Sequence, residues 1–98
     1  MAGHRRTHDQ VEGDREARSI AASLGRVVRE ARRRRGWTQA RLGAAVGLSH
    51  ARIGDIERGH GTGTPLLAWV RIGAVLDRPL AAAFSRDLDP PTLPTPVT

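Results

Sequence analysis

The strongest constraint on the fold is a pattern that occurs twice in the middle of the chain. A hydroxyl residue that can cap a helix is followed by about eight residues at helical spacing and then by a glycine. Thr38 and Gly47 bound the first copy, and Ser49 and Gly59 bound the second. Serine and threonine accept hydrogen bonds from the free N–H groups of a helix start, and glycine commonly ends a helix. The sequence therefore predicts two short helices, over residues 39–46 and 50–58.

An amphipathic helix is predicted before this pair and ends at Gly36. Its apolar residues recur every three or four positions, which places them on one face of a helix. They are Ile20, Leu24, Val27, Val28 and Ala31. Most arginines of this segment lie outside that stripe. The run Arg32 to Arg35 is either a solvated helix face or a source of phosphate contacts. In both cases its positive charge attracts an anionic partner.

A fourth helix is predicted after the second short one. Thr64 stands before Pro65, a combination typical of a cap followed by proline at the first helical position. The helical pattern then continues to about Leu76. Because this segment is apolar nearly all round, Leu67 and Val75 are expected outside the main core. No segment of useful length has the spacing of a strand, so the predicted fold is all-α.

The two ends of the chain differ in composition from its middle. Residues 1–18 contain almost no large apolar side chain and cannot offset the entropy of ordering, which predicts a flexible arm. Residues 85–98 are rich in proline, which favours an extended tail or linker. A turn at 77–79 should lead into a last short helix that ends at Phe84. The predicted domain thus has five helices and spans residues 19–84.

Composition excludes several classes of site. The 98 residues include no cysteine, which excludes disulfides, thiolate zinc sites and a cysteine nucleophile. The four histidines show no metal-ligand spacing, and neither paired carboxylates nor a phosphate-cradling glycine motif is present. No apolar run approaches the roughly 18 residues of a membrane span. The net charge of +6, with arginine as every basic residue, favours an anionic partner. We therefore expect a cytoplasmic protein without catalytic residues, metal or cofactor.

The turn between the two short helices carries the functional prediction. Only three residues separate these helices, so they must cross steeply. Leu42, Val46, Ile53 and Ile56 can then share one interior, and Gly43 is expected to face Ile53 at the crossing. The outer face of the second short helix stays polar. In such a helix-turn-helix, the second helix has the right width to fit into the DNA major groove.

The residues at these positions resemble the phage repressor and Cro type of helix-turn-helix, also called the xenobiotic-response-element type of transcriptional regulator. The resemblance covers about residues 24–84. It rests on Ala31-Arg32, Gly36-Trp37-Thr38-Gln39, Leu42, Val46-Gly47-Leu48-Ser49, Ile53 and Ile56-Glu57-Arg58-Gly59. It implies a DNA-binding domain like that of lambda repressor. It also implies a partly buried ion pair between Arg32 and Glu57, which would lock the first helix to the third.

The resemblance also implies which residues contact DNA. Gln39 matches a residue that bonds a phosphate and braces the recognition helix. Three positions usually read base edges, and two usually contact phosphates or flanking groups. The full predicted DNA-binding set is Gln39, Arg41, Ser49, His50, Ala51, Arg52, Asp55 and Arg58. The base readers in it are His50, Ala51 and Asp55, and the flanking contacts are Arg52 and Arg58. Gly54, within the predicted recognition helix, indicates either close approach to DNA or a substitution without functional meaning.

Together these features predict sequence-specific binding of double-stranded DNA by a transcriptional regulator, a repressor, with helix 50–58 in the major groove. A homodimer is expected because it is usual in this family. The protein is also expected to be associated with the nucleoid. The alternative function is an adaptor: an antitoxin that binds a toxin, or the DNA-targeting module of a larger protein. The proline-rich residues 85–98 favour this alternative because they resemble a linker.

Overall fold

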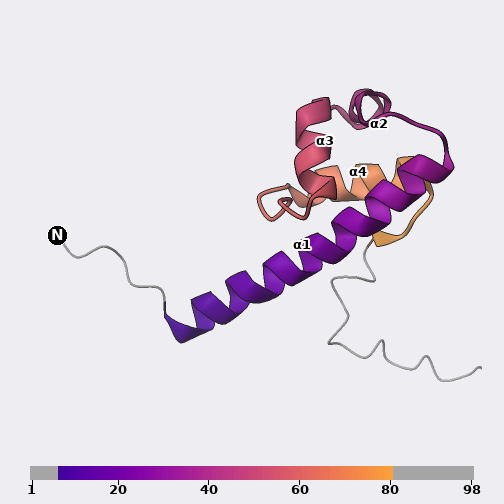
Figure 1. Cartoon of the computed structure of the whole chain (residues 1–98). Coiled ribbons are helices and arrows are strands. Elements are labelled where there is room, and N and C mark those ends of the chain that lie inside the picture. Colours follow the sequence, from indigo (N-terminus) through magenta and orange to yellow (C-terminus); the bar gives the residue numbers. More distant parts are fainter. Residues whose placement is uncertain (1–6, 81–98) are drawn as a thin grey trace, which may run out of the picture.

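A computed structural model describes residues 7–80 of the chain. Within these residues it contains four α-helices and no strand, as the all-α prediction requires (Figure 1). The helices are α1 (His8–Arg34), α2 (Gln39–Val46), α3 (His50–Glu57) and α4 (Leu66–Leu76). The fifth helix expected to end at Phe84 and the tail at 85–98 lie outside the described residues.

Helix α1 is longer than the sequence predicts. It begins at His8, and its N-terminal half extends away from the other three helices (Figure 1). Thr7 and Gln10 form a capping box: the Thr7 hydroxyl accepts from the Gln10 N–H at 3.1 Å, and the Gln10 side-chain carbonyl accepts from the Thr7 N–H at 2.8 Å. The prediction of a flexible arm is therefore wrong for residues 8–18. Adding turns to a helix already nucleated by packing requires little further burial, which explains the difference.

The caps that delimit α2 and α3 are present. The Thr38 hydroxyl accepts from the Arg41 N–H, and the Ser49 hydroxyl accepts from the Arg52 N–H, each at 3.0 Å. Gly47 adopts φ 78° where α2 ends, a left-handed conformation that favours glycine. The start and stop signals of both short helices thus act as the sequence indicates.

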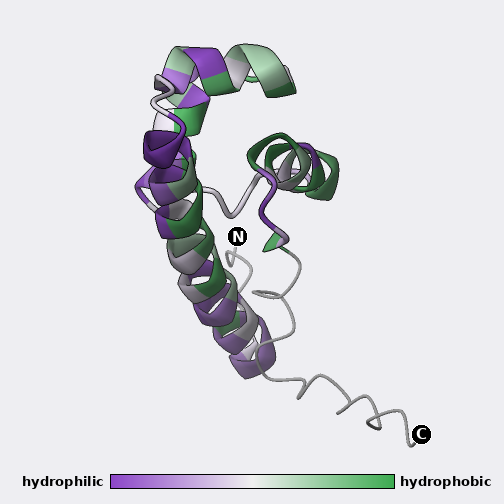
Figure 2. Ribbon diagram, turned by 90° about the vertical axis from the view of Figure 1, so that its right-hand side faces the viewer, coloured by the Kyte–Doolittle hydropathy of each residue, from purple (hydrophilic) through white to green (hydrophobic). Residues whose placement is uncertain are grey.

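The core lies where the four helices meet. All four contribute apolar side chains, and α4, seen nearly end-on in Figure 2, is mostly hydrophobic. The buried cluster comprises Leu24, Val28, Ala31, Leu42, Val46, Ile53, Ile56, Trp69, Ile72, Leu76 and Leu80. Val27, expected in the stripe of α1, is instead 36% exposed, because it lies at the edge of the face that packs. Val75, expected outside, packs against the core.

The steep crossing of α2 and α3 depends on Gly43, which lies against the backbone of the turn. A Cβ on Gly43 would collide with the backbone carbonyl oxygen of Leu48. The Leu48 N–H also donates to the Gly43 carbonyl at 2.9 Å, so the turn folds back tightly onto α2. This close approach of two backbone segments is what requires glycine here.

Candidate nucleic-acid interface

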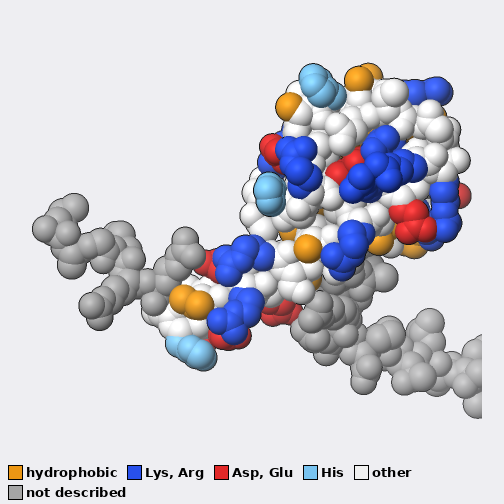
Figure 3. All heavy atoms as spheres, in the orientation of Figure 1, with side chains coloured by type: hydrophobic (Ala, Val, Ile, Leu, Met, Phe, Trp, Pro, Cys, Tyr) orange, Lys and Arg blue, Asp and Glu red, His pale blue; other side chains and the backbone are white. Residues whose placement is uncertain are grey.

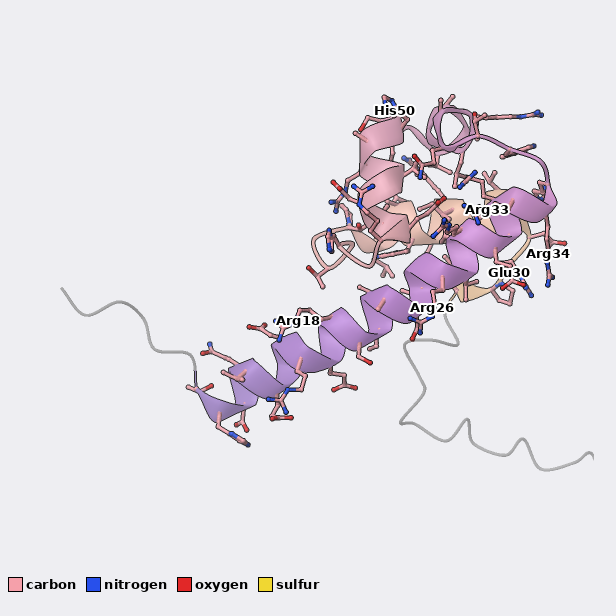
Figure 4. All side chains as sticks on the ribbon, viewed as in Figure 1. Arg18, Arg26, Glu30, Arg33, Arg34 and His50 are labelled. Atoms are coloured by element: carbon pink, nitrogen blue, oxygen red, sulfur yellow. The ribbon has the colours of Figure 1, made fainter. Side chains whose placement is uncertain are left out.

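Helix α3 divides its residues between the core and the surface. Ile53, Ile56 and Glu57 are buried, whereas His50 and Ala51 at the N-terminal end are exposed. His50 projects from the free end of α3, far from the extended half of α1 (Figure 4). The geometry therefore leaves the start and outer face of α3 open, with its inner face fixed to the body.

A buried ion pair fixes the orientation of α3. Arg32 of α1 donates from Nε to one Glu57 oxygen at 2.5 Å and from Nη2 to the other at 2.9 Å. The two residues are only 8% and 7% exposed. The hydrogen bond to Glu57 raises the pKa of Arg32, against the opposing effect of burial. The structure thus contains the pair that the resemblance implies, in a two-bond geometry that carries directional information.

The ion pair extends into a small polar network. Arg32 also donates from Nη1 to the carbonyl of Trp37 at 2.7 Å, which holds the segment between α1 and α2. Gln39 donates from Nε2 to a Glu57 oxygen at 3.3 Å. Among the described residues, no buried side-chain nitrogen or oxygen lacks a partner. Glu57 therefore joins α1, the start of α2 and the end of α3, and Gln39 lies in the bracing position predicted for it.

Gly54 lies beneath this network. A Cβ built on Gly54 would lie 3.1 Å from Arg58 Nη1 and 3.4 Å from Gln39 Oε1, and the residue is buried. The missing side chain therefore leaves room for Gln39 and Arg58. This contact differs from both interpretations of Gly54 left open by the sequence, since it faces neighbouring side chains of the protein.

Two predicted DNA contacts pair with each other. Arg58 donates from Nη2 to Asp55 at 2.6 Å across one turn of α3, and both side chains are largely exposed. A pair of this kind contributes little to stability in water. Its chemical consequence is that Arg58 offsets the charge with which Asp55 would repel phosphates.

Arg52 contacts the segment after α3. Its Nη2 donates to the Thr64 hydroxyl at 2.8 Å. Thr64 was predicted to cap the fourth helix, but Pro65 is the N-cap of α4 and no side-chain cap is present there. The prediction of the cap is wrong because the threonine hydroxyl has a long-range partner. Arg52 is consequently half-buried and ordered at the edge of the α3 surface.

Arginines also stack on Trp37. The guanidinium carbon of Arg41 lies 4.6 Å from the Trp37 ring centroid, and that of Arg35 lies 5.6 Å from it. Such cation–π contacts position the arginines without neutralising them. Arg41 was predicted as a DNA contact, but its stacking on Trp37 was not predicted. The signal for it was the spacing of Trp37 and Arg41, which brings them together across the first turn of α2.

The surface around α3 is rich in arginine. Figure 3 shows several blue side chains on the body above α1 with red ones among them, and blue and red side chains also lie together on the extended half of α1. Arg33, Arg34 and Arg35 at the end of α1 are exposed, and Arg34 pairs with Glu30 at 2.5 Å. Ser49, the remaining predicted contact, is exposed at the turn before α3.

Residues 7–80 contain neither a metal-binding cluster nor a membrane-spanning helix. These residues include no cluster of three or more histidine or acidic side chains suited to a metal ion. None of their helices combines the length and apolarity needed to cross a membrane.

Comparison with known proteins agrees with this geometry. The helix-turn-helix domain family matches residues 23–82, more than half of the chain. The chain belongs to the helix-turn-helix family. The HTH-type transcriptional regulator SutR of Escherichia coli strain K12 is 35% identical over 78 residues, which cover 80% of this chain and 41% of SutR. The chain thus spans less than half the length of this relative. No solved structure matches it.

Membership of this family confirms the resemblance to regulators of the repressor and Cro type. In the helix-turn-helix of this chain, α2 is the first helix, residues 47–49 form the turn, and α3 is the second helix. The second helix of such a unit is the one that reads DNA in the major groove.

Proposed function

We propose that this protein binds double-stranded DNA sequence-specifically and regulates transcription as a repressor, with α3 in the major groove. The observation that carries the proposal is the anchoring of α3. Its inner end is locked by Arg32 and Gln39 through Glu57, while His50 and Ala51 at its other end are exposed. A helix held rigidly with its N-terminal residues free can present them to base edges at a defined angle.

The base readers proposed are His50, Ala51 and Asp55. A histidine ring both donates and accepts hydrogen bonds, depending on tautomer. Alanine contacts the thymine methyl group, and a carboxylate accepts from the amino group of cytosine. These contacts predict a preference for a half-site that contains both thymine and cytosine, in place of equal affinity for all sequences.

The phosphate contacts proposed flank these readers. The start of α2 offers free N–H groups and a dipole that both favour anions, and Gln39 and Arg41 stand there. Ser49 lies at the start of α3, where its side chain would contact the DNA backbone near the phosphates proposed for Gln39 and Arg41. Arg52 and Arg58 border the other edge of α3. Together they would fix the register of the helix, which phosphate contacts do without reading sequence.

A second function is supported by the length of SutR. Because this chain corresponds to 41% of that regulator, the same DNA-binding domain would also serve as the targeting module of a longer protein. In both cases the chain acts in the cytoplasm on chromosomal DNA, and its own part in the process involves no cofactor or covalent chemistry. The proline-rich residues 85–98 would then connect it to a partner domain.

Salt-titrated binding to duplex DNA tests the proposal. Sequencing of co-purified DNA first supplies a half-site. About five phosphate contacts per subunit predict a log–log salt slope near −4 to −5. Arg58→Ala should weaken binding to all sequences, whereas His50→Ala should change the preference between sequences.

The matched control is Arg18→Ala, an exposed arginine on the extended half of α1, away from α3 (Figure 4). It should leave both affinity and preference unchanged. Failure to bind duplex DNA at low salt would contradict the proposal, and so would equal losses in the Arg18 and Arg58 variants.

A further inference from the structure

Two of the proposed base readers lie one turn apart on α3. Ala51 and Asp55 are four positions apart, which places their side chains on the same face of the helix. Side chains of a helix lean toward its N-terminus, so the Asp55 carboxylate leans toward Ala51. Ala51 is exposed, and the side chain of Asp55 is 44% exposed. A single base placed against this face can therefore contact both residues.

Asp55 has one carboxylate oxygen left to accept from a base. Its Oδ1 accepts from Arg58 Nη2 at 2.6 Å, which holds the carboxylate in place, and no group within residues 7–80 donates to Oδ2. An ionised carboxylate accepts hydrogen bonds and donates none. In the major groove cytosine presents its N4 amino group, whereas thymine presents the O4 oxygen at the equivalent position. Asp55 therefore favours cytosine and disfavours thymine.

Ala51 favours the other pyrimidine. Its side chain is a methyl group, which makes apolar contacts only, and the apolar group that bases present in the major groove is the C5-methyl group of thymine. Unmodified cytosine has only a hydrogen atom at C5. Neither base thus satisfies both readers at once, since thymine lacks the amino group and cytosine lacks the methyl group. 5-Methylcytosine carries both groups on neighbouring ring atoms, C4 and C5.

We infer that Ala51 and Asp55 together recognise 5-methylcytosine, with its C5-methyl group against Ala51 and its N4 amino group donating to Asp55 Oδ2. This inference rests on the DNA-binding function proposed above and adds to it a dependence on the methylation of the DNA. Burial of one methyl group raises affinity about fourfold. Binding to the half-site would then respond to the methylation of one cytosine.

Competition binding with synthetic duplexes tests the inference. The duplexes carry the half-site recovered by sequencing, and each cytosine in turn is replaced by 5-methylcytosine, by N4-methylcytosine or by thymine with adenine opposite. At one position 5-methylcytosine should bind about fourfold more tightly than cytosine. Thymine there should bind at least about fivefold more weakly than 5-methylcytosine, since its O4 faces the carboxylate. N4-methylcytosine carries its methyl group on the amino nitrogen and should give no gain.

Two variants separate the two contacts. Ala51→Gly should bring the affinity ratio between 5-methylcytosine and cytosine close to one. Asp55→Asn should reduce the ratio between 5-methylcytosine and thymine, because an amide can also donate to O4. Each ratio compares two duplexes bound by the same protein, so a loss of stability does not mimic the loss of a contact. The matched control is Ala45→Gly, at an exposed alanine of α2, which should preserve both ratios.

Three results would overturn the inference. They are a half-site without cytosine, equal affinity for methylated and unmethylated duplexes at every position, and a fourfold ratio that persists in Ala51→Gly. Each of them leaves the binding of duplex DNA by α3 intact. Failure to bind any duplex would instead overturn the proposed function together with this inference.

Discussion

Helices α3 and α4 both pack apolar side chains into the core, but among the four helices' contacts only the attachment of α3 to α1 and α2 adds a buried polar network. The end of α3 is held by polar groups: Glu57 bonds to Arg32 and Gln39 while almost completely buried. Helix α4 is held by apolar packing through Trp69 and Ile72, and it also exposes apolar side chains on its outer face. Hydrogen bonds between ionised groups specify direction, whereas apolar contacts specify only proximity. The helix proposed to read DNA is thus the one whose angle is fixed by directional bonds.

The largest expected effect comes from breaking the polar attachment. Glu57→Gln leaves Arg32 buried with its charge unbalanced, and it should lower the free energy of unfolding by about 3 to 5 kcal/mol. Urea denaturation at neutral pH measures this loss. In the control Glu30→Gln, which breaks the exposed pair with Arg34, the change should stay below about 1 kcal/mol. Equal effects in the two variants would show that burial of the pair contributes nothing.

Breaking the apolar attachment should cost less. Ile72 on the inner side of α4 is fully buried, and Ile72→Ala should destabilise the fold by about 3 kcal/mol through lost burial and a cavity. Val70→Ala on the outer side should change the stability of the monomer by less than about 0.5 kcal/mol. Thermal unfolding at a concentration low enough to avoid association compares the two. A larger effect at Val70 would mean that the outer face is covered within the monomer.

A substitution at Gly54 should affect DNA binding and protein stability differently. Gly54→Ala removes a cost of about 1 kcal/mol for glycine within a helix, so the protein should not be less stable. The new Cβ displaces Arg58 and presses on Gln39, and affinity for a half-site should fall about fivefold, near 1 kcal/mol. Gly13→Ala is the control, since no atom other than those of its chain neighbours and its own helix backbone lies within 4 Å of its added Cβ. Unchanged affinity in the Gly54 variant would show that neither displaced side chain contributes to binding.

The smallest effect is expected at the start of α1. Thr7→Ala removes one partner of the capping box and should weaken the first turn by about 1 kcal/mol, with global stability unchanged. Hydrogen exchange of the Gln10 and Val11 amides measures this local opening. Thr62→Ala in the exposed loop before α4 serves as the control. A fall in global Tm would show that the extended half of α1 is part of the cooperative core.

Local sequence signals predicted much of the helix-turn-helix. Thr38, Ser49 and Gly47 determine the ends of α2 and α3 through bonds within a few residues, so their roles were visible without the structure. The Arg32–Glu57 pair joins residues far apart in sequence, and it was accessible only through the resemblance to a known family.

Three features could not be predicted from the sequence, and each failure has a physical reason. The extended half of α1 buries few side chains, so arguments from burial predicted no order there, although Thr7 and Gln10 matched a capping box. The Thr64 hydroxyl had two available partners, and only the tertiary fold brings Arg52 close enough to compete with the helix start. The close approach of the Leu48 carbonyl to Gly43 was not predicted, because the path of the turn backbone depends on the crossing itself.

The central claim is that the anchored helix α3, with the start of α2, forms the DNA-binding surface. Amide NMR spectra of the full chain titrated with duplex DNA test it most directly. We predict that the largest shifts lie within residues 38–41 and 49–58, with little change along the extended half of α1. Shifts concentrated on α4, with the amides of α3 unaffected, would contradict the account.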